Sequence, residues 1–152
     1  MLPISPRADS TVLIYLDNSV LNRPFDDQRQ PRIWLETLSF SLVLTLIEAA
    51  EAKLIRSPIH DLENSRNPFV PRRQWVEKCL RLAEQRVALC ESIKTRASAL
   101  GRAGIGALDA LHVACAEAAS AERFLTCDDR VIRRYSGRMT VQNPVTFTTT
   151  LT

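Results

Sequence analysis

Residues 104–130 read GIGALDALHVACAEAASAERFLTCDDR. Within them, residues 107–120 are rich in Ala and Leu and predict a helix. Residues 123–127 are apolar enough to predict a short buried strand, and two acids, Asp128 and Asp129, follow it directly. A helix that leads into such a strand is typical of α/β domains, where helices connect the strands of a parallel sheet.

The rest of the chain repeats this alternation. Residues 12–16 (VLIYL) are almost wholly apolar and end in polar residues 17–19, as a buried central strand does. Strands are expected at residues 12–16, 53–57, 87–90 and 123–127, with an edge strand at 139–142. Helices are expected at residues 31–52, 58–67, 71–85, 92–101, 107–120 and 129–135. The pattern predicts a three-layer α/β/α fold with a central parallel sheet of four to five strands.

Size and composition indicate one globular domain. The chain has 152 residues, of which 45% are hydrophobic and 24% charged, and this excludes collagen-like, low-complexity and disordered sequences. We expect a single domain over residues 1–152, with a core from about residue 12 to residue 144 and short tails at both ends. The tail 146–152 is expected to be frayed.

Charge and cysteine usage narrow the class of protein. The net charge is only +3, yet 17 of the 20 basic residues are Arg, which fits phosphate contact and equally fits ordinary surface chemistry. No Cys-x-x-Cys pair occurs, so buried thiols are expected at Cys79, Cys90, Cys115 and Cys127. The first 16 residues show no secretory signal, and the apolar run 42–47 is too short to span a bilayer. We therefore expect a soluble cytoplasmic protein without membrane association.

Four acids lie where parallel sheets gather ligands, at or near the carboxyl ends of strands. Asp17 follows the first strand and Asp128 the fourth. Glu63 lies on the helix after the second strand, and Asp109 is the third residue of the helix before the fourth. Alone, each has a local explanation as a turn residue, helix cap, first-turn acid or solvated side chain. Together, acids embedded in apolar sequence need a neutralising partner, and a divalent cation held by several carboxylates supplies one.

These segments resemble the PIN-domain nucleases, the family that includes VapC-type toxins. The resemblance covers roughly residues 12–144 and is carried by residues 16–21 (LDNSVL), Glu63, residues 108–112 (LDALH) and residues 125–130 (LTCDDR). Family members hold one or two Mg²⁺ or Mn²⁺ ions with three or four acids and cut single-stranded or structured RNA. The resemblance therefore implies a metal-dependent endoribonuclease with RNA as substrate and, for a toxin, an antitoxin protein as partner.

The same resemblance implies roles for individual residues. Catalytic and metal-binding roles fall on Asp17, Glu63, Asp109 and Asp128. Ser19 and Thr126 match the family's supporting residues, Asp61 is the rival of Glu63, and Asp129 shares the last position with Asp128. RNA-binding roles are expected for the arginines near the rim, Arg23, Arg130, Arg133 and Arg134. For Arg133 and Arg134 a solvated helix face is an equally good explanation.

The chemistry of the residue types agrees with this assignment. Mg²⁺ prefers oxygen ligands and keeps several waters, whereas Zn²⁺ prefers His and Cys, and no Cys–His spacing supports a zinc site. The two histidines are His60 and His112, and His112 lies in an Ala–Leu helix as a packed core residue would. A metal-activated water needs no side-chain nucleophile.

Other functions fit the residues less well. A non-catalytic PIN-like protein that binds RNA or an antitoxin would gain from losing the acids, because they repel an anionic strand. A phospho-receiver domain needs a late Lys, but the last one is Lys94, and a phosphatase with an Asp-x-Asp loop fails at Ser19. The broad apolar face of the helix at 31–52 would serve a homodimer, although a buried core helix would look the same.

Overall fold

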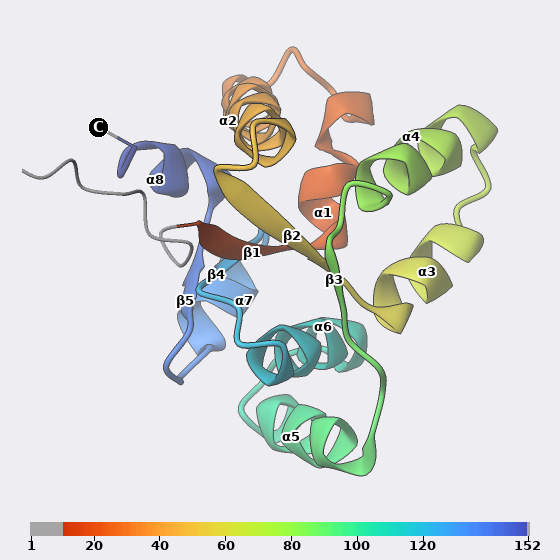
Figure 1. The fold of residues 1–152 in the computed structure, drawn as a ribbon, viewed down its shortest axis with the longest axis vertical. Coiled ribbons are helices and arrows are strands. Elements are labelled where there is room, and N and C mark those ends of the chain that lie inside the picture. The colour runs from red at the N-terminus through yellow and green to blue at the C-terminus, as the bar shows by residue number, and fades with distance from the viewer. Residues whose placement is uncertain (1–10, 152) are drawn as a thin grey trace, which may run out of the picture.

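The structure, a computed structural model, describes residues 11–151, so the N-terminal tail expected before residue 12 lies almost wholly outside the described residues. A five-stranded sheet runs through the centre in the order β3-β2-β1-β4-β5, and every pairing in it is parallel (Figure 1). The strands are β1 (Val12–Leu16), β2 (Ala52–Arg56), β3 (Gln85–Arg86), β4 (Arg123–Leu125) and β5 (Thr140–Gln142). The predicted parallel sheet is confirmed.

The central strand β1 is buried on both faces. Ile14 and Leu16 point to one side of the sheet and Tyr15 to the other, and all three are fully buried. In the ladder, Ile14 lies opposite Leu54 of β2 and Arg123 of β4. After β1 the chain builds β2 and β3 on one side, then crosses to β4 and β5 on the other. The carboxyl ends of β1 and β4 therefore border the point where the strand order reverses, where α/β folds bind ligands.

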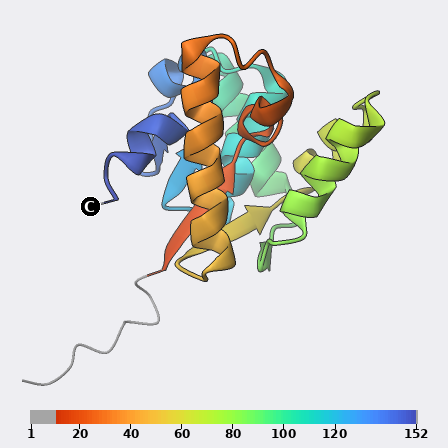
Figure 2. The same cartoon turned by 90° about the horizontal axis from the view of Figure 1, so that it is seen from above.

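Helices cover both faces of the sheet (Figures 1 and 2). The longer ones are α2 (Pro31–Glu48), α4 (Val70–Leu80), α5 (Glu91–Arg102) and α6 (Ala107–Ala118). The shorter ones are α1 (Asn18–Leu21), α3 (Pro58–Ser65), α7 (Asp129–Arg134) and α8 (Pro144–Thr148), with a 3-10 turn at Arg23–Phe25. In Figure 1, α1, α2, α4 and α8 lie on one side of the sheet and α5, α6 and α7 on the other, which confirms the three-layer architecture.

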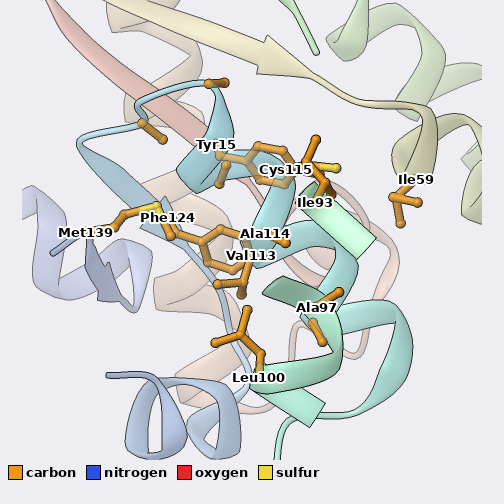
Figure 3. Close-up of a cluster of buried hydrophobic side chains, with 14 of the residues drawn as sticks. Tyr15, Ile59, Ile93, Ala97, Leu100, Val113, Ala114, Cys115, Phe124 and Met139 are labelled. Carbon is orange, nitrogen blue, oxygen red and sulfur yellow. The ribbon is translucent and has the colours of Figure 1, made fainter. Parts of the chain in front are cut away.

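Each face of the sheet has its own hydrophobic core. On one face, Tyr15 and Phe124 stack with ring centroids 5.2 Å apart. Val113 and Ala114 of α6 and Leu100 of α5 pack over them (Figure 3). The other core joins alternate residues of β1 to α1, α2, α4 and α8.

The third strand is not where the sequence predicts it. Residues 85–86 pair with Ile55 and Arg56, whereas residues 87–90 lie outside the ladder. β2 also begins and ends one residue earlier than predicted, and the ladder ends where the carbonyl of Arg56, its last residue, accepts from the N–H of Val87 at 3.1 Å. The long helix is also shorter than predicted, because Ala50 adopts a φ of 59° and the chain turns into β2.

Two further expectations are wrong. The C-terminal segment is not frayed at residues 146–148, since it forms α8 beside α2 (Figure 2). Phe147 of α8 is buried in the core with 2% exposure. Cys90 is exposed at the start of α5, while the other three cysteines are buried as predicted. Among the described residues, no helix combines the length and the apolar character that a membrane crossing needs.

Candidate active site

The four predicted acids line one cleft of about 460 Å³ at the carboxyl edge of the sheet. They come from four segments: Asp17 follows β1, Glu63 lies on α3, Asp109 is in the first turn of α6, and Asp128 precedes α7. The other lining residues are Asn18, Ser19, Asn22, Arg66, Asn67, Pro68, Phe69 and Arg72. The fold therefore brings the whole predicted acid set to one place.

Asp17 is almost buried, at 4% exposure, and both of its carboxylate oxygens are held. Oδ1 accepts a hydrogen bond from the backbone N–H of Asn18 at 2.8 Å, as the cap of α1. Oδ2 accepts from Ser19 Oγ at 2.7 Å and from Thr126 Oγ1 at 2.8 Å. A turn or cap role explains the first contact only. The residues predicted to support the acids, Ser19 and Thr126, both contact this carboxylate.

Asp128 and Asp129 diverge although they are adjacent. Asp128 caps α7 by accepting from the backbone N–H of Arg130 at 2.9 Å, and it lines the cleft. Its own N–H donates to Thr126 Oγ1 at 3.0 Å. Asp129 instead accepts two hydrogen bonds from Arg32 of α2, at 2.7 and 2.8 Å, which lower the pKa of its carboxyl group. The structure thus places Asp129 in an ion pair outside the cleft.

Glu63 faces the cleft, and its rival Asp61 faces away from it. Glu63 accepts from Asn18 Nδ2 at 3.3 Å through one oxygen and from His112 Nε2 through the other. Asp61 forms an ion pair with Arg56 at 2.5 Å. Arg56 is nearly buried at the end of β2. Its ion pair with Asp61 holds that side chain on the side of α3 away from Glu63.

A buried hydrogen-bond network supports Glu63 from behind. When His112 Nε2 donates to Glu63, its Nδ1 accepts from the hydroxyl of Tyr15 at 2.5 Å, and that hydroxyl also contacts Ser57 Oγ at 2.6 Å. Burial raises the pKa of Tyr15 well above its ordinary value, so the hydroxyl retains its proton. The sequence predicted only the core packing of His112, but its spacing of three residues from Asp109 on one helix was a signal for the site.

His60, the other histidine, has a structural role. Its ring stacks on Tyr15 with centroids 4.6 Å apart, Nδ1 accepts from Ser57 N–H at 3.1 Å, and Nε2 donates to the carbonyl of Leu16 at 2.7 Å. Burial lowers the pKa of His60 to about 3, so the ring is neutral at physiological pH. It ties the start of α3 to the end of β1.

The cleft brings four carboxyl groups together. Burial, followed by the charges of Asp17 and Asp128, raises the pKa of Asp109 to about 6. Within residues 11–151, none of the four acids forms an ion pair with Lys or Arg. Carboxylates gathered in this way favour a cation.

The donor set fits a hard divalent cation in an open site. Across residues 11–151, no three His, Cys, Asp or Glu side chains are close enough to enclose an ion between them. Mg²⁺ does not need a closed cage of protein ligands, because it keeps several of its waters and binds through a few carboxylates. The oxygen donors at the cleft therefore suit Mg²⁺ or Mn²⁺.

The predicted RNA-binding arginines lie outside the cleft. Arg23 pairs with the buried Glu36 at 2.9 Å and with Asp26 at 3.0 Å, which raises the pKa of its guanidinium against the effect of burial. Arg130, Arg133 and Arg134 are exposed on α7. The two arginines that line the cleft are Arg66 and Arg72, neither of which the sequence predicted to bind RNA. Arg66 lies three residues after Glu63 in the sequence, and this spacing is a local feature that could have indicated it.

A larger hollow of about 670 Å³ lies between α3 and α4. Both of its acids are already paired: Asp61 and Glu77 contact Arg56, and Arg81 also contacts Glu77. This mutual neutralisation contrasts with the unpaired acids of the smaller cleft. The smaller cleft is therefore the better candidate for catalysis.

Comparisons with known proteins agree with this geometry. The family model for the PIN domain matches residues 14–137. The crystal structure of FitAcB from Neisseria gonorrhoeae is similar, with a TM-score of 0.53 and 20% sequence identity over 86% of this chain and 97% of that chain. At this level of identity the likeness shows a shared fold. No curated protein matches the chain.

Proposed function

Because the chain belongs to the PIN domain family, whose members are generally nucleases, we propose that it is an endoribonuclease that hydrolyses RNA with Mg²⁺ or Mn²⁺. The observation that carries this proposal is the cleft lined by Asp17, Glu63, Asp109 and Asp128. These carboxylates repel one another and would repel an RNA strand, so the cleft suits a nuclease only together with a cation.

The chain's own residues position the proposed ligands. Ser19 and Thr126 orient one oxygen of Asp17, and the backbone of Asn18 orients the other. His112 and the side chain of Asn18 orient Glu63. Asp17 and Glu63 are therefore both held in place by hydrogen-bond donors from the chain itself. When bound, Mg²⁺ or Mn²⁺ would supply the Lewis acid that polarises the phosphodiester and activates a water.

Basic residues around the cleft would hold the RNA. Arg66 and Arg72 line it directly, and Arg130, Arg133 and Arg134 lie exposed on α7, the helix that Asp128 caps. Contacts of this kind to phosphates position a strand without reading its sequence. Arg23, which is held by Glu36 and Asp26, is the least available of the arginines selected from the sequence.

Partners and location form a finer part of the proposal. Since the family includes VapC-type toxins, we propose an antitoxin protein as partner and the cytoplasm as the place of action, where the four free thiols would stay reduced. A homodimer is supported by Trp34, Leu38 and Leu42, which follow one another at four-residue spacing along α2 with exposures of 51%, 47% and 42%. Sedimentation of the parent and of Trp34→Lys tests that surface.

The test of the enzymatic proposal is cleavage of a mixed RNA substrate during titration with Mg²⁺, Mn²⁺ and chelator. We expect activity with either ion and none in excess chelator. Asp17→Asn should lower the rate by at least about 100-fold, because it removes charge from a proposed ligand while keeping its shape. Asp27→Asn, which changes an exposed acid outside the cleft, is the matched control. Full activity in chelator, or restoration by Zn²⁺ alone, contradicts the metal assignment.

The alternative is a non-catalytic PIN-like protein that binds RNA or an antitoxin. It predicts RNA binding of equal strength with and without metal, and no cleavage under any of these conditions. The uncompensated acids disfavour it, because they weaken the binding of an anionic strand.

A further inference from the structure

Phe69 stands at the rim of the cleft as an exposed aromatic ring. We propose that this ring stacks on an unpaired base of the substrate, next to the phosphate that lies at the four acids, so that the protein selects single-stranded RNA. The inference rests on the proposed nuclease function and deepens it by naming the part of the substrate that the rim contacts.

The first observation is the exposure of Phe69 within a local aromatic cluster. Phe69 lines the cleft and is 64% exposed, the highest value among the large apolar residues that the structure describes. Phe25 lies nearby at 40% exposure. The guanidinium of Arg72 is placed over both rings, 5.4 Å from the centre of Phe25 and 5.8 Å from that of Phe69. Single exposed apolar residues need no explanation, but an aromatic and cationic group beside an acid-lined cleft does.

The second observation is that the segment carrying Phe69 is braced. The N–H of Phe69 donates to Asn67 Oδ1 at 3.2 Å, and Arg73 donates to the carbonyl of Asn67 at 2.9 Å. Pro68, which lies between Asn67 and Phe69 in the chain, restricts the backbone further. Asn67 Nδ2 also donates to Oδ1 of Asn22, at the end of α1, at 3.5 Å. With its backbone held in this way, Phe69 has only its two side-chain torsions left to order when a ligand stacks on the ring.

The third observation is the distribution of positive charge. Arg66 and Arg72 are the basic residues among those that line the cleft, and they come from the end of α3 and from α4, on the segment that also carries Phe69. Arg72 donates to the carbonyl of Phe25 at 3.1 Å and forms an ion pair with Asp26 at 3.7 Å. Arg66 is exposed and forms no ion pair within residues 11–151. A strand that enters the cleft would therefore meet a stacking face and a phosphate-binding group on one side and the carboxylates on the other.

This arrangement fits an unpaired base better than a duplex. Base–aromatic stacking needs a free base face, which a base inside a helix does not offer, and it tolerates every base because each has such a face. Stacking on Phe69 would therefore favour single-stranded over double-stranded RNA, and it would depend little on the base sequence.

The test measures binding rather than cleavage, so that it stands apart from the nuclease assay. Asp17→Asn protein is titrated, in Mg²⁺, with a labelled short single-stranded RNA and with copies that carry one abasic ribose at successive positions. We expect one position at which base removal weakens binding about tenfold. In a Phe69→Leu background the intact RNA should bind about tenfold more weakly, and that positional effect should vanish.

Phe25→Leu is the matched control, because it removes the other aromatic neighbour of Arg72 but leaves the ring that lines the cleft. It should preserve the abasic effect. Equal losses in Phe25→Leu and Phe69→Leu would overturn the proposal, since Phe69 would then act only by holding Arg72. Unchanged binding in Phe69→Leu, or equal affinity for a duplex of the same sequence, would overturn it as well. Absence of cleavage by the parent protein, with the abasic effect intact, would contradict the nuclease proposal and leave the stacking site standing.

Discussion

His112 on α6 donates a hydrogen bond from Nε2 to Glu63 on α3, across 49 residues of sequence. The histidine is fully buried, whereas the carboxylate reaches the cleft. Because the other ring nitrogen is fixed by Tyr15, the imidazole cannot turn without breaking two contacts. A core residue thereby controls the direction of a proposed metal ligand, as groups behind metal ligands commonly do.

Replacing His112 tests this positioning role. His112→Leu should lower RNA cleavage about 10- to 100-fold and raise the Mg²⁺ concentration needed for half-maximal rate, because Glu63 loses its donor. His112→Gln should recover much of both, since its amide nitrogen reaches near the position of Nε2. Both variants lose the bond to Tyr15, so urea unfolding should show similar losses of stability. Equal activity in the two variants would contradict the positioning role and leave a purely structural one.

Asp109 should make the metal-free protein sensitive to pH. Its pKa is raised to about 6 from an ordinary 3.8, so the folded state disfavours its charged form. The stability it contributes is thus present below the unfolded-state pKa and lost as the pH rises through about 6. In chelator near neutral or alkaline pH, Asp109→Asn should be more stable than the parent by about 1 kcal/mol, allowing for its partial exposure.

Thermal melts of the parent and of Asp109→Asn, each in chelator and in Mg²⁺, measure this effect. Added Mg²⁺ should stabilise the variant less than the parent, because ligand binding adds stability in proportion to affinity for the native state. The competing explanation, a favourable acid in the first turn of a helix, predicts a loss of about 0.3 to 1 kcal/mol in both conditions. A less stable variant with an unchanged Mg²⁺ increment would remove Asp109 from the site.

Arg130 and Arg134 should contribute to RNA binding through counterion release. Arg130→Ala and Arg134→Ala should each weaken binding and reduce the slope of log affinity against log salt by about 0.7 for a single strand. Arg81→Ala is the matched control, because that side chain is 74% exposed and lies at the other hollow. If both variants bind RNA as tightly as the parent at low and at high salt, these arginines are exposed to solvent and do not contact the RNA.

Phe147 should make the C-terminal helix part of the folding unit. Phe147→Ala should destabilise the protein by about 3 to 5 kcal/mol in urea unfolding, because it empties a buried site beside α2. Thr146→Ala, an exposed position on the same helix, should change stability by less than about 0.5 kcal/mol. Similar results for both variants would mean that α8 is not packed as described.

Local sequence was enough for the architecture and for three of the four acids. The apolar run at residues 12–16 and the alternation of strand and helix patterns predict a parallel sheet, and Asp17 and Asp128 follow strands whose ends are marked by the change to polar residues. Asp109 is placed by its position in the first turn of a strongly helical segment. These features depend on neighbouring residues, whose periodicity and propensity are visible in the chain itself.

Long-range contacts decided the rest. Asp61 and Glu63 lie on one helix, and the choice between them follows from Arg56, which draws Asp61 away from the cleft. Asp129 is adjacent to Asp128, yet Arg32, 97 residues away, holds it outside. The contact between His112 and Glu63 and the placing of Arg72 over Phe25 likewise join separate elements. Which charges and rings meet depends on how helices are seated on the sheet, and this packing is set by the whole core rather than by any local pattern.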